Sequence, residues 1–137
     1  MSITNLANSF KLASIQPLEA LTLKMILVLS SYTFDPTHEF VDDLVPGTNE
    51  ATGYTRPTLA TVTATQNDID NRAELTFDPV TIASVAPQFI YAAWIYEFVT
   101  NDADSLLKWF VVLNKSANGE DLVLTPGATG VLHAVEV

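Results

Sequence analysis

The sequence predicts an all-β protein, an antiparallel β-sandwich or jelly-roll-like domain of about seven or eight strands. Short segments alternate apolar and polar residues, as the strands of a half-buried sheet do. Other short segments are apolar at nearly every position, which is typical of central strands. Clusters of Gly, Pro, Asn and Asp separate these segments, and few stretches show helical spacing.

Alternation is clearest in residues 72–78. Ala73, Leu75 and Phe77 share one face of the expected strand, whereas Glu74 and its polar neighbours share the other. This pattern predicts a strand with one face in the core and one face in water. Residues 59–65 alternate in the same way and predict a second such strand.

Three segments are apolar on both alternating faces: residues 23–29, 89–98 and 106–113. We interpret them as central strands, or as strands whose second face meets a partner chain. Near the end of the sequence, residues 120–125 and 130–137 flank the stretch PGATG. Proline and two glycines between apolar runs predict a hairpin that pairs these two segments.

Two short stretches depart from the strand pattern. Residues 5–15 (NLANSFKLASI) place Leu6, Phe10 and Leu12 at roughly helical spacing, which predicts a short helix or an arm within residues 1–16. Residues 37–44 predict a short helical turn, for which Thr37 is a good N-cap.

Length and charge limit the function classes. With 137 residues, we expect one domain over 1–137, with 1–16 as its arm. The formal net charge of -10 disfavours nucleic-acid binding. The absence of cysteine excludes disulfides and sulfur-based zinc sites. We find no apolar run of membrane-spanning length and no signal peptide, so we expect a soluble, unprocessed chain without a membrane partner.

The residues His38, Asp42 and Asp43 are the candidates for a metal or acid-base site. On a helix, His38 and Asp42 would share a face, and a histidine with carboxylates can hold a divalent cation. A capped turn explains the same residues more simply, because acids near a helix N-terminus complement its dipole. We therefore favour the structural interpretation and predict no catalytic residue, no metal and no cofactor.

Other polar candidates also have simpler explanations. His133 alternates with valines, which favours a packed or interface histidine, and no serine lies in a nucleophile-elbow context. The Asp pairs at 68 and 70 and at 102 and 104 resemble fragments of calcium loops but lack the continuation that an EF-hand needs. We interpret both pairs as acidic turns.

Aromatic residues supply a last candidate surface. Trp94 and Trp109 are accompanied by four further aromatics, Phe89, Tyr91, Tyr96 and Phe110. On one sandwich face they would form a platform for stacking sugars. Aromatics in apolar strands more often belong to the core or to a subunit contact, so we favour that reading and count Trp94 and Trp109 as interface candidates.

Four short motifs make nearly the whole chain resemble a family of small virion structural proteins of tailed bacteriophages. The motifs are NSFK (8–11), a strand from LK (23–24) into SYT (31–33), THEF (37–40) and GYT (53–55). One departure is visible: where the family pattern has SGTGYT and a glycine pair, this chain has EATGYTRP. A stiffer Arg56-Pro57 step therefore replaces a flexible turn.

The resemblance implies a small β-rich component of the head or tail without enzymatic activity. We expect a capsid cement or decoration protein, made in the bacterial host cytoplasm and located on the outer capsid surface. The expected partners are the major capsid protein and further copies of this chain. A trimer is expected by analogy with decoration proteins at the three-fold positions of a shell.

The apolar strand faces and the N-terminal segment are the expected contacts. The expected interface residues are Leu6, Phe10, Leu12, Trp94 and Trp109. Two alternatives stay open at this point. One is a tail or head-fibre adaptor that binds a host glycan, and the other is a small carbohydrate-active or metal-dependent enzyme that uses His38 with Asp42 and Asp43.

Overall fold

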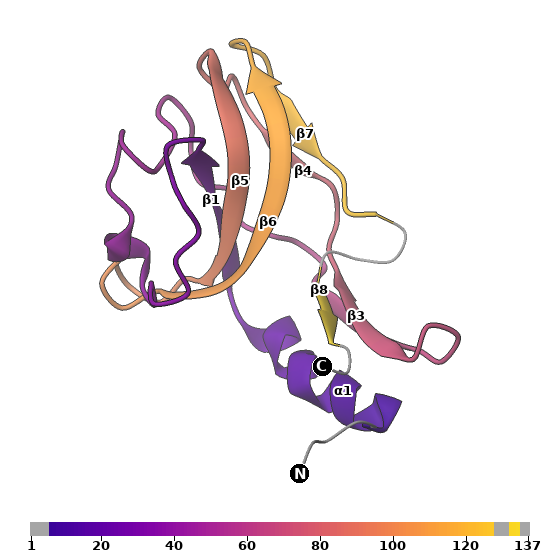
Figure 1. Ribbon diagram of the computed structural model, residues 1–137. Helices are drawn as coiled ribbons and strands as arrows, with labels where there is room; N and C mark the ends of the chain where they lie inside the picture. The colour runs from indigo at the N-terminus through magenta and orange to yellow at the C-terminus, as the bar shows by residue number, and fades with distance from the viewer. Residues whose placement is uncertain (1–5, 128–131, 135–137) are drawn as a thin grey trace. The chain divides into compact units, whose positions relative to one another are not determined.

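The computed structural model describes residues 6–127 and 132–134 and divides into two compact units. The smaller unit comprises Met1–Leu21, Ala60–Pro79 and Thr125–Val137, and the larger comprises Thr22–Leu59 and Val80–Leu124. The described strands pair antiparallel throughout, as predicted (Figure 1). The single domain over 1–137 with residues 1–16 as an arm stays a prediction.

The smaller unit packs helix α1 against a sheet of strand order β2-β3-β8. Its elements are α1 (Asn8–Ile15), the 3-10 turn η1 (Gln16–Ala20), β2 (Thr63–Asn67), β3 (Arg72–Thr76) and β8 (Leu132–Ala134). The predicted helix is therefore confirmed, and it is part of a packed unit.

Helix α1 directs its only charged side chain inward. Lys11 is 2% exposed, and its Nζ donates hydrogen bonds to the Asn71 carbonyl (2.6 Å) and to Asn8 Oδ1 (3.3 Å). Phe10, the residue before Lys11 in the helix, is 61% exposed. A buried ammonium is tolerable only with such partners, so the polar contacts that satisfy Lys11 also fix which face of the helix looks outward.

Strand β3 is buried on both faces, contrary to the prediction of a wet face. Ala73 and Leu75 are fully buried as expected, but Glu74 is buried too. Its Oε1 accepts hydrogen bonds from Arg72 Nε (2.8 Å) and from Asn67 Nδ2 (2.7 Å). Polar alternation predicted solvent on this face, but local hydrogen-bond partners allow the carboxylate to be buried.

The larger unit contains the three-stranded sheet β1-β5-β6 and the ribbon β4-β7. Its elements are β1 (Leu23–Leu29), the 3-10 turn η2 (Val41–Asp43), β4 (Val80–Ile82), β5 (Gln88–Glu97), β6 (Leu106–Ala117) and β7 (Leu122–Leu124). The three doubly apolar segments of the sequence are thus the strands of this sheet.

The hairpin predicted around PGATG is not formed. Strand β7 pairs with β4, and β8 pairs with β3, so the two segments join different sheets. Residues 128–131 of the connecting stretch lie outside the described residues. Turn-forming residues predicted a reversal of the chain, but they could not specify the partner of each flanking strand.

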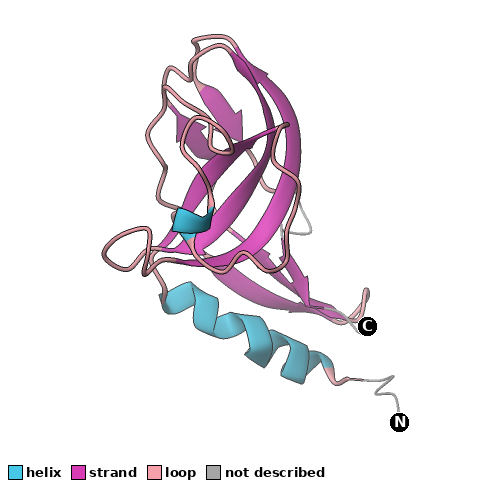
Figure 2. Cartoon of the chain, turned by 60° about the vertical axis from the view of Figure 1, so that its left-hand side comes forward, coloured by secondary structure: helices cyan, strands magenta, loops and turns pink. Residues whose placement is uncertain are grey.

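Strands β1 and β5 are buried on both faces by their own chain. On one face, Ile26, Val28, Trp94 and Tyr96 form a cluster with three residues of the loop after β1, which are Tyr32, Val41 and Leu44. Figure 2 shows this loop in pink, with η2 in cyan, in front of the magenta sheet. For these two strands the expected partner chain is therefore not required, because a long loop supplies the cover.

The same loop follows the outer edge of β1 with backbone hydrogen bonds. Leu29 N–H donates to the Asn49 carbonyl (2.8 Å), and Ala51 N–H donates to the Leu27 carbonyl (2.9 Å). Farther along, Met25 N–H donates to the carbonyl of Pro57 (3.1 Å). This edge of the sheet is thus satisfied without a regular fourth strand.

Arg56 anchors the loop through a fork of charged hydrogen bonds. Its Nε and NH2 donate to the two carboxylate oxygens of Glu50 (2.7 and 2.8 Å), while NH1 donates to Asp102 Oδ1 (2.7 Å). The Tyr54 hydroxyl donates to Glu50 Oε1 (2.8 Å) and accepts from Leu27 N–H (2.9 Å). Arg56 therefore forms a clamp between its own loop and the β5-β6 loop, which carries Asp102.

Electrostatics in this clamp follow from its geometry. The Glu50 carboxylate, with Asp102, raises the pKa of Arg56 above its usual value, so the guanidinium stays charged. Burial, with the nearby Glu50 charge, raises the pKa of Tyr54 above its usual value and keeps its hydroxyl protonated as a donor.

Replacing Arg56 by Ala should lower the free energy of unfolding by about 3 kcal/mol, because it leaves the largely buried Glu50 carboxylate without its counter-charge. Arg56→Lys should lower the free energy of unfolding by less, since an ammonium keeps the charge but cannot form the two-pronged contact. Urea unfolding of the three proteins measures this. Equal stability of wild type and the alanine variant would contradict the clamp.

Gly53 is required where two loops come close together. Its φ is +67°, and an added Cβ would lie 2.5 Å from the Ala86 Cβ. Ala86 N–H also donates to the Gly53 carbonyl (3.2 Å), which holds the two backbones together. The GYT motif thus combines a glycine that permits the approach with a tyrosine that bonds β1.

Gly53→Ala should be more destabilising than Gly119→Ala. Both glycines have positive φ, which costs an alanine roughly 1–2 kcal/mol. An alanine at residue 53 would also clash with Ala86, which should lower the free energy of unfolding by about 1–3 kcal/mol more. An alanine at residue 119 would not, because nothing lies within 4 Å of a Cβ at Gly119. Chemical denaturation of the two variants checks the order, and a reversed order would refute the argument.

Candidate functional site

The acidic turn at residues 35–43 is organised by aspartate side chains. Asp35 Oδ1 accepts from the backbone N–H of Thr37 (2.8 Å) and from its hydroxyl (2.6 Å). Asp43 Oδ2 accepts from the N–H groups of Glu39 (2.9 Å) and Phe40 (3.0 Å). Thr37 is therefore not a helix N-cap, and the helical turn is limited to Val41–Asp43.

This correction removes the basis for a metal site. Residues 37–40 are not helical, so His38 and Asp42 do not share a helix face. His38 Nδ1 lies 3.0 Å from the Tyr32 hydroxyl, which also accepts from Trp94 Nε1 (3.2 Å). Within residues 6–127 and 132–134, no three metal-binding side chains converge. The histidine connects the turn to the buried Trp94.

Hydrogen bonds also explain why the pKa values of Asp35 and Asp43 are lowered. The Thr37 hydroxyl and N–H lower the pKa of Asp35 below its usual value. The N–H groups of Phe40 and Glu39 lower the pKa of Asp43 in the same way. These shifts stabilise ionised carboxylates in a turn, which requires no catalytic role.

The aspartates of the two predicted acidic turns also accept hydrogen bonds from other side chains of the chain. Asp68 Oδ1 accepts from Asn8 Nδ2 (3.0 Å) and Gln66 Nε2 (2.6 Å), and these two donors lower the Asp68 pKa below its usual value. Asp70 accepts from Asn67 (3.0 Å), and Asp104 accepts from Asn101 (2.9 Å). Asp102 accepts a hydrogen bond from Arg56 in the clamp, a contact that the sequence pattern did not predict.

The two tryptophans do not form one platform. Trp94 pairs with Phe110 across the strands, and the neighbouring pair is Ile95 with Trp109, so the two indoles lie on opposite faces of the sheet. Both tryptophans are buried, as is Tyr96. Neither indole offers a broad exposed face for a partner in the isolated chain.

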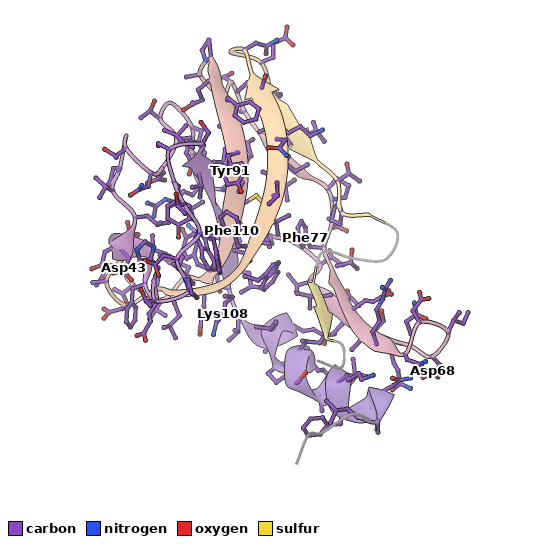
Figure 3. The ribbon with its side chains drawn as sticks, in the orientation of Figure 1. Asp43, Asp68, Phe77, Tyr91, Lys108 and Phe110 are labelled. Carbon is purple, nitrogen blue, oxygen red and sulfur yellow. The ribbon has the colours of Figure 1, made fainter. Side chains whose placement is uncertain are left out.

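An aromatic hollow nevertheless forms at β6. It has a volume of about 420 Å³ and is open to solvent. Its lining residues are Phe34, Trp94, Lys108, Trp109 and Phe110. We call this set the aromatic hollow. Figure 3 shows Phe110 near Tyr91 on the strands and Lys108 nearer the start of β6.

Phe34 forms the outer wall of the aromatic hollow. It is 48% exposed, and its ring stacks on that of Trp94 with centroids 5.6 Å apart and 25° between the planes. The Phe110 ring contacts both, at 5.4 Å from Phe34 and 5.3 Å from Trp94. No sequence pattern predicts a site at Phe34, because the residue follows β1 in a polar turn.

A β-bulge places Lys108 at the hollow. Tyr96 pairs with Leu107 and Ile95 pairs with Trp109, so Lys108 has no counterpart on β5. Its Nζ lies 3.2 Å from Glu97 Oε2, and both side chains reach solvent. Bulges commonly redirect a side chain beside a functional site. Periodicity in the sequence predicted the strand but not its bulge.

The uncovered part of the β6 edge begins at this bulge. Leu107 N–H donates to the Glu39 carbonyl (2.8 Å), and Phe40 bridges Leu106, so the loop after β1 covers the first residues of β6. Farther along, β6 has a strand partner on one side only in the described part of the chain. The aromatic hollow therefore lies at an open edge.

The remaining predicted interface residues lie in the smaller unit. Leu6 and Leu12 of the N-terminal segment are partly exposed, and Phe10 is exposed. His133 lies in β8, for which the structure describes the backbone alone. No described helix is long and apolar enough to cross a membrane.

Comparison of the chain with protein-family models, with curated proteins and with solved structures found no match.

Asp43→Ala should lower the free energy of unfolding by about 1 kcal/mol at neutral pH, because two N–H groups lose their acceptor. The folded pKa of Asp43 is below its unfolded value, so its ionised form contributes stability above about pH 4 and loses it as pH falls through the folded pKa. The difference in the free energy of unfolding between wild type and the Asp43→Ala variant should therefore become smaller at acidic pH.

Asp42→Ala is the matched control, since it removes the neighbouring charge but leaves those N–H groups bonded to Asp43. Urea unfolding between neutral pH and about pH 2 measures both variants. Equal behaviour of the two variants would show that the Asp43 hydrogen bonds contribute nothing.

Proposed function

We propose that this chain is a non-enzymatic structural protein of a tailed-phage virion, specifically a capsid cement or decoration protein. In this role it binds the major capsid protein on the outer capsid surface and ties neighbouring capsid subunits together. Two features support the proposal: the resemblance to virion proteins, whose named motifs lie between residues 8 and 55, and an exposed apolar surface in the smaller unit.

The main structural support for this function is the exposed apolar surface beside the first turn of α1. Phe10 is 61% exposed and Ile69, in the β2-β3 turn, is 92% exposed. The Asn8-Asp68 hydrogen bond (3.0 Å) ties the start of α1 to this turn and brings the two segments together. We call Phe10, Ile69 and the partly exposed Leu6 the helix-turn surface.

A contiguous patch of exposed apolar side chains marks an interaction site more often than isolated exposed residues do. The buried Lys11 strengthens this argument, because its hydrogen bonds hold α1 with Phe10 outward. A decoration protein needs only such a contact, repeated at many symmetric sites, since repetition supplies avidity without a strong individual interface.

The proposal includes a homo-oligomer, with a trimer as the expected form. A surplus of apolar strand faces in the sequence favours association, but the loop after β1 covers apolar residues of β1 and β5. The helix-turn surface is therefore the proposed contact with capsid or with a second copy. A jelly-roll form of the sandwich, an architecture that occurs in viral capsids, also belongs to this proposal.

The test uses capsids that lack this protein. Phe10→Ser and Ile69→Ser should each weaken capsid binding about tenfold or more, because each removes an apolar anchor. Val123→Ser, at an exposed position of the larger unit, is the control and should bind normally. Point variants are preferable to deletion of residues 1–16, which would remove the buried Lys11 and Ile15.

Sedimentation of the same proteins at several concentrations tests the oligomer separately. Wild type should associate, and the Phe10 variant should shift toward monomer if copies meet at the helix-turn surface. Capsid binding that is unchanged in both serine variants would refute the proposed interface, and failure of wild type to bind any phage capsid would refute the function.

A further inference from the structure

Apolar side chains on one face of the β1-β5-β6 sheet are only partly covered. Phe110 pairs with Trp94, and Val112 follows two residues later in the same regular stretch, so all three point to one face. Phe34 stacks on Trp94 from that side, and the ring centroids of Tyr91 and Phe110 lie 6.0 Å apart (Figure 3). We call Phe34, Tyr91, Phe110 and Val112 the aromatic face.

The aromatic face is open to solvent. Val112 is 53% exposed and Phe34 is 48% exposed, while Tyr91 and Phe110 are partly exposed. With about 200 Å² for a whole aromatic side chain, the exposed parts amount to about 250 Å² of apolar surface. A contiguous apolar patch approaching this size commonly marks a contact site.

Charge favours a second copy of this chain as the partner of the aromatic face. The formal charge of -10 makes copies repel each other unless the surfaces that meet lack carboxylates. No residue of the aromatic face is charged, and Asp35, which follows Phe34, is bonded to Thr37. On the helix-turn surface, by contrast, the exposed Asp68 and Asp70 flank Ile69, so two copies meeting there would bring carboxylates together.

The shape of the aromatic face also suits contact with an identical surface. Phe34, Trp94 and Phe110 line the aromatic hollow, and Val112 lies two residues beyond Phe110 on β6. Under a two-fold axis, Val112 of each copy can enter the hollow of the other, because every contact in such an interface occurs twice. Two sheets that pack in this way form a sandwich between copies.

We infer that two copies of this chain pack through their aromatic faces as a two-fold dimer. The inference deepens the proposed homo-oligomer, on which it rests, and leaves the helix-turn surface to the capsid. A contact between identical surfaces closes at two copies, so it predicts a dimer where the analogy with decoration proteins predicts a trimer. Stable interfaces bury about 600 Å² or more per partner, so this smaller apolar surface should give a weak dimer with a micromolar dissociation constant.

Pairing of two β6 edges fits less well. A bulge at Lys108 interrupts the edge, the register shifts again opposite Tyr91, and Lys115 is exposed. Bulges and lysines are the features by which natural sheets prevent pairing at an open edge. The copies should therefore meet through a sheet face and not extend the sheet.

Sedimentation of the full-length protein from micromolar to millimolar concentration tests the dimer. The mass of wild type should rise from one copy to two. Val112→Asp should weaken association about tenfold or more, because it places like charges at the contact between copies. Val123→Asp is the matched control and should associate normally, since Val123 is 54% exposed and lies on β7. Phe34→Ala should weaken association roughly three- to tenfold.

The two tryptophans locate the contact. In ¹⁵N-labelled protein each indole N–H gives its own NMR signal, and the chain has 2 tryptophans. Trp94 lies under Phe34, whereas Trp109 points to the opposite face of the sheet. The Trp94 signal should therefore shift more than the Trp109 signal as the concentration rises. Well-dispersed amide spectra confirm that each variant is folded.

Four results would overturn the inference. The first is a wild type that stays monomeric at every concentration, and the second is a trimer. The third is association that Val112→Asp and Phe34→Ala both leave unchanged. The fourth is loss of association in Phe10→Ser alone, which would keep the proposed homo-oligomer but move its contact to the helix-turn surface. Capsid binding is measured separately, so failure of the dimer leaves the capsid role standing, and the reverse also holds.

Discussion

Burial of β5 on both faces is the constraint on which the larger unit depends. A strand of such apolar composition needs cover on each side, and the loop after β1 covers one face with Tyr32, Val41 and Leu44. That loop must then satisfy its own backbone, which it does along β1, and it must be held in place, which Arg56 does through Glu50 and Asp102. The clamp is therefore a consequence of the doubly buried strand.

The sequence predicted those parts of the fold that depend on local patterning. Strand β1 has the predicted bounds, β5 and β6 lie where apolar runs occur, and α1 lies where helical spacing occurs. Long-range partners were not predictable: the hairpin at PGATG fails because β7 and β8 pair with distant strands. Buried charge also escaped prediction, since Lys11 and Glu74 depend on acceptors and donors contributed by other segments.

The same distinction applies to the candidate sites. Phe10 was nominated from its apolar character and is exposed, whereas Trp94 and Trp109 were nominated for the same reason and are buried. Phe34 and Lys108 escaped notice because their importance comes from position: one follows β1 and covers Trp94, and the other is displaced by a bulge. A single sequence reports which residues are apolar but not which of them the fold leaves uncovered.

The discontinuity of the smaller unit has a consequence for biosynthesis. Its sheet takes β2 and β3 from the middle of the chain and β8 from near its end, whereas the last strand of the larger unit, β7, ends at Leu124. During translation, the larger unit can therefore complete its sheets first, while β3 waits with one edge open until β8 leaves the ribosome. In that interval the nascent smaller unit presents an unpaired edge of β3, so a slow ribosome or a truncated message would favour aggregation through that edge.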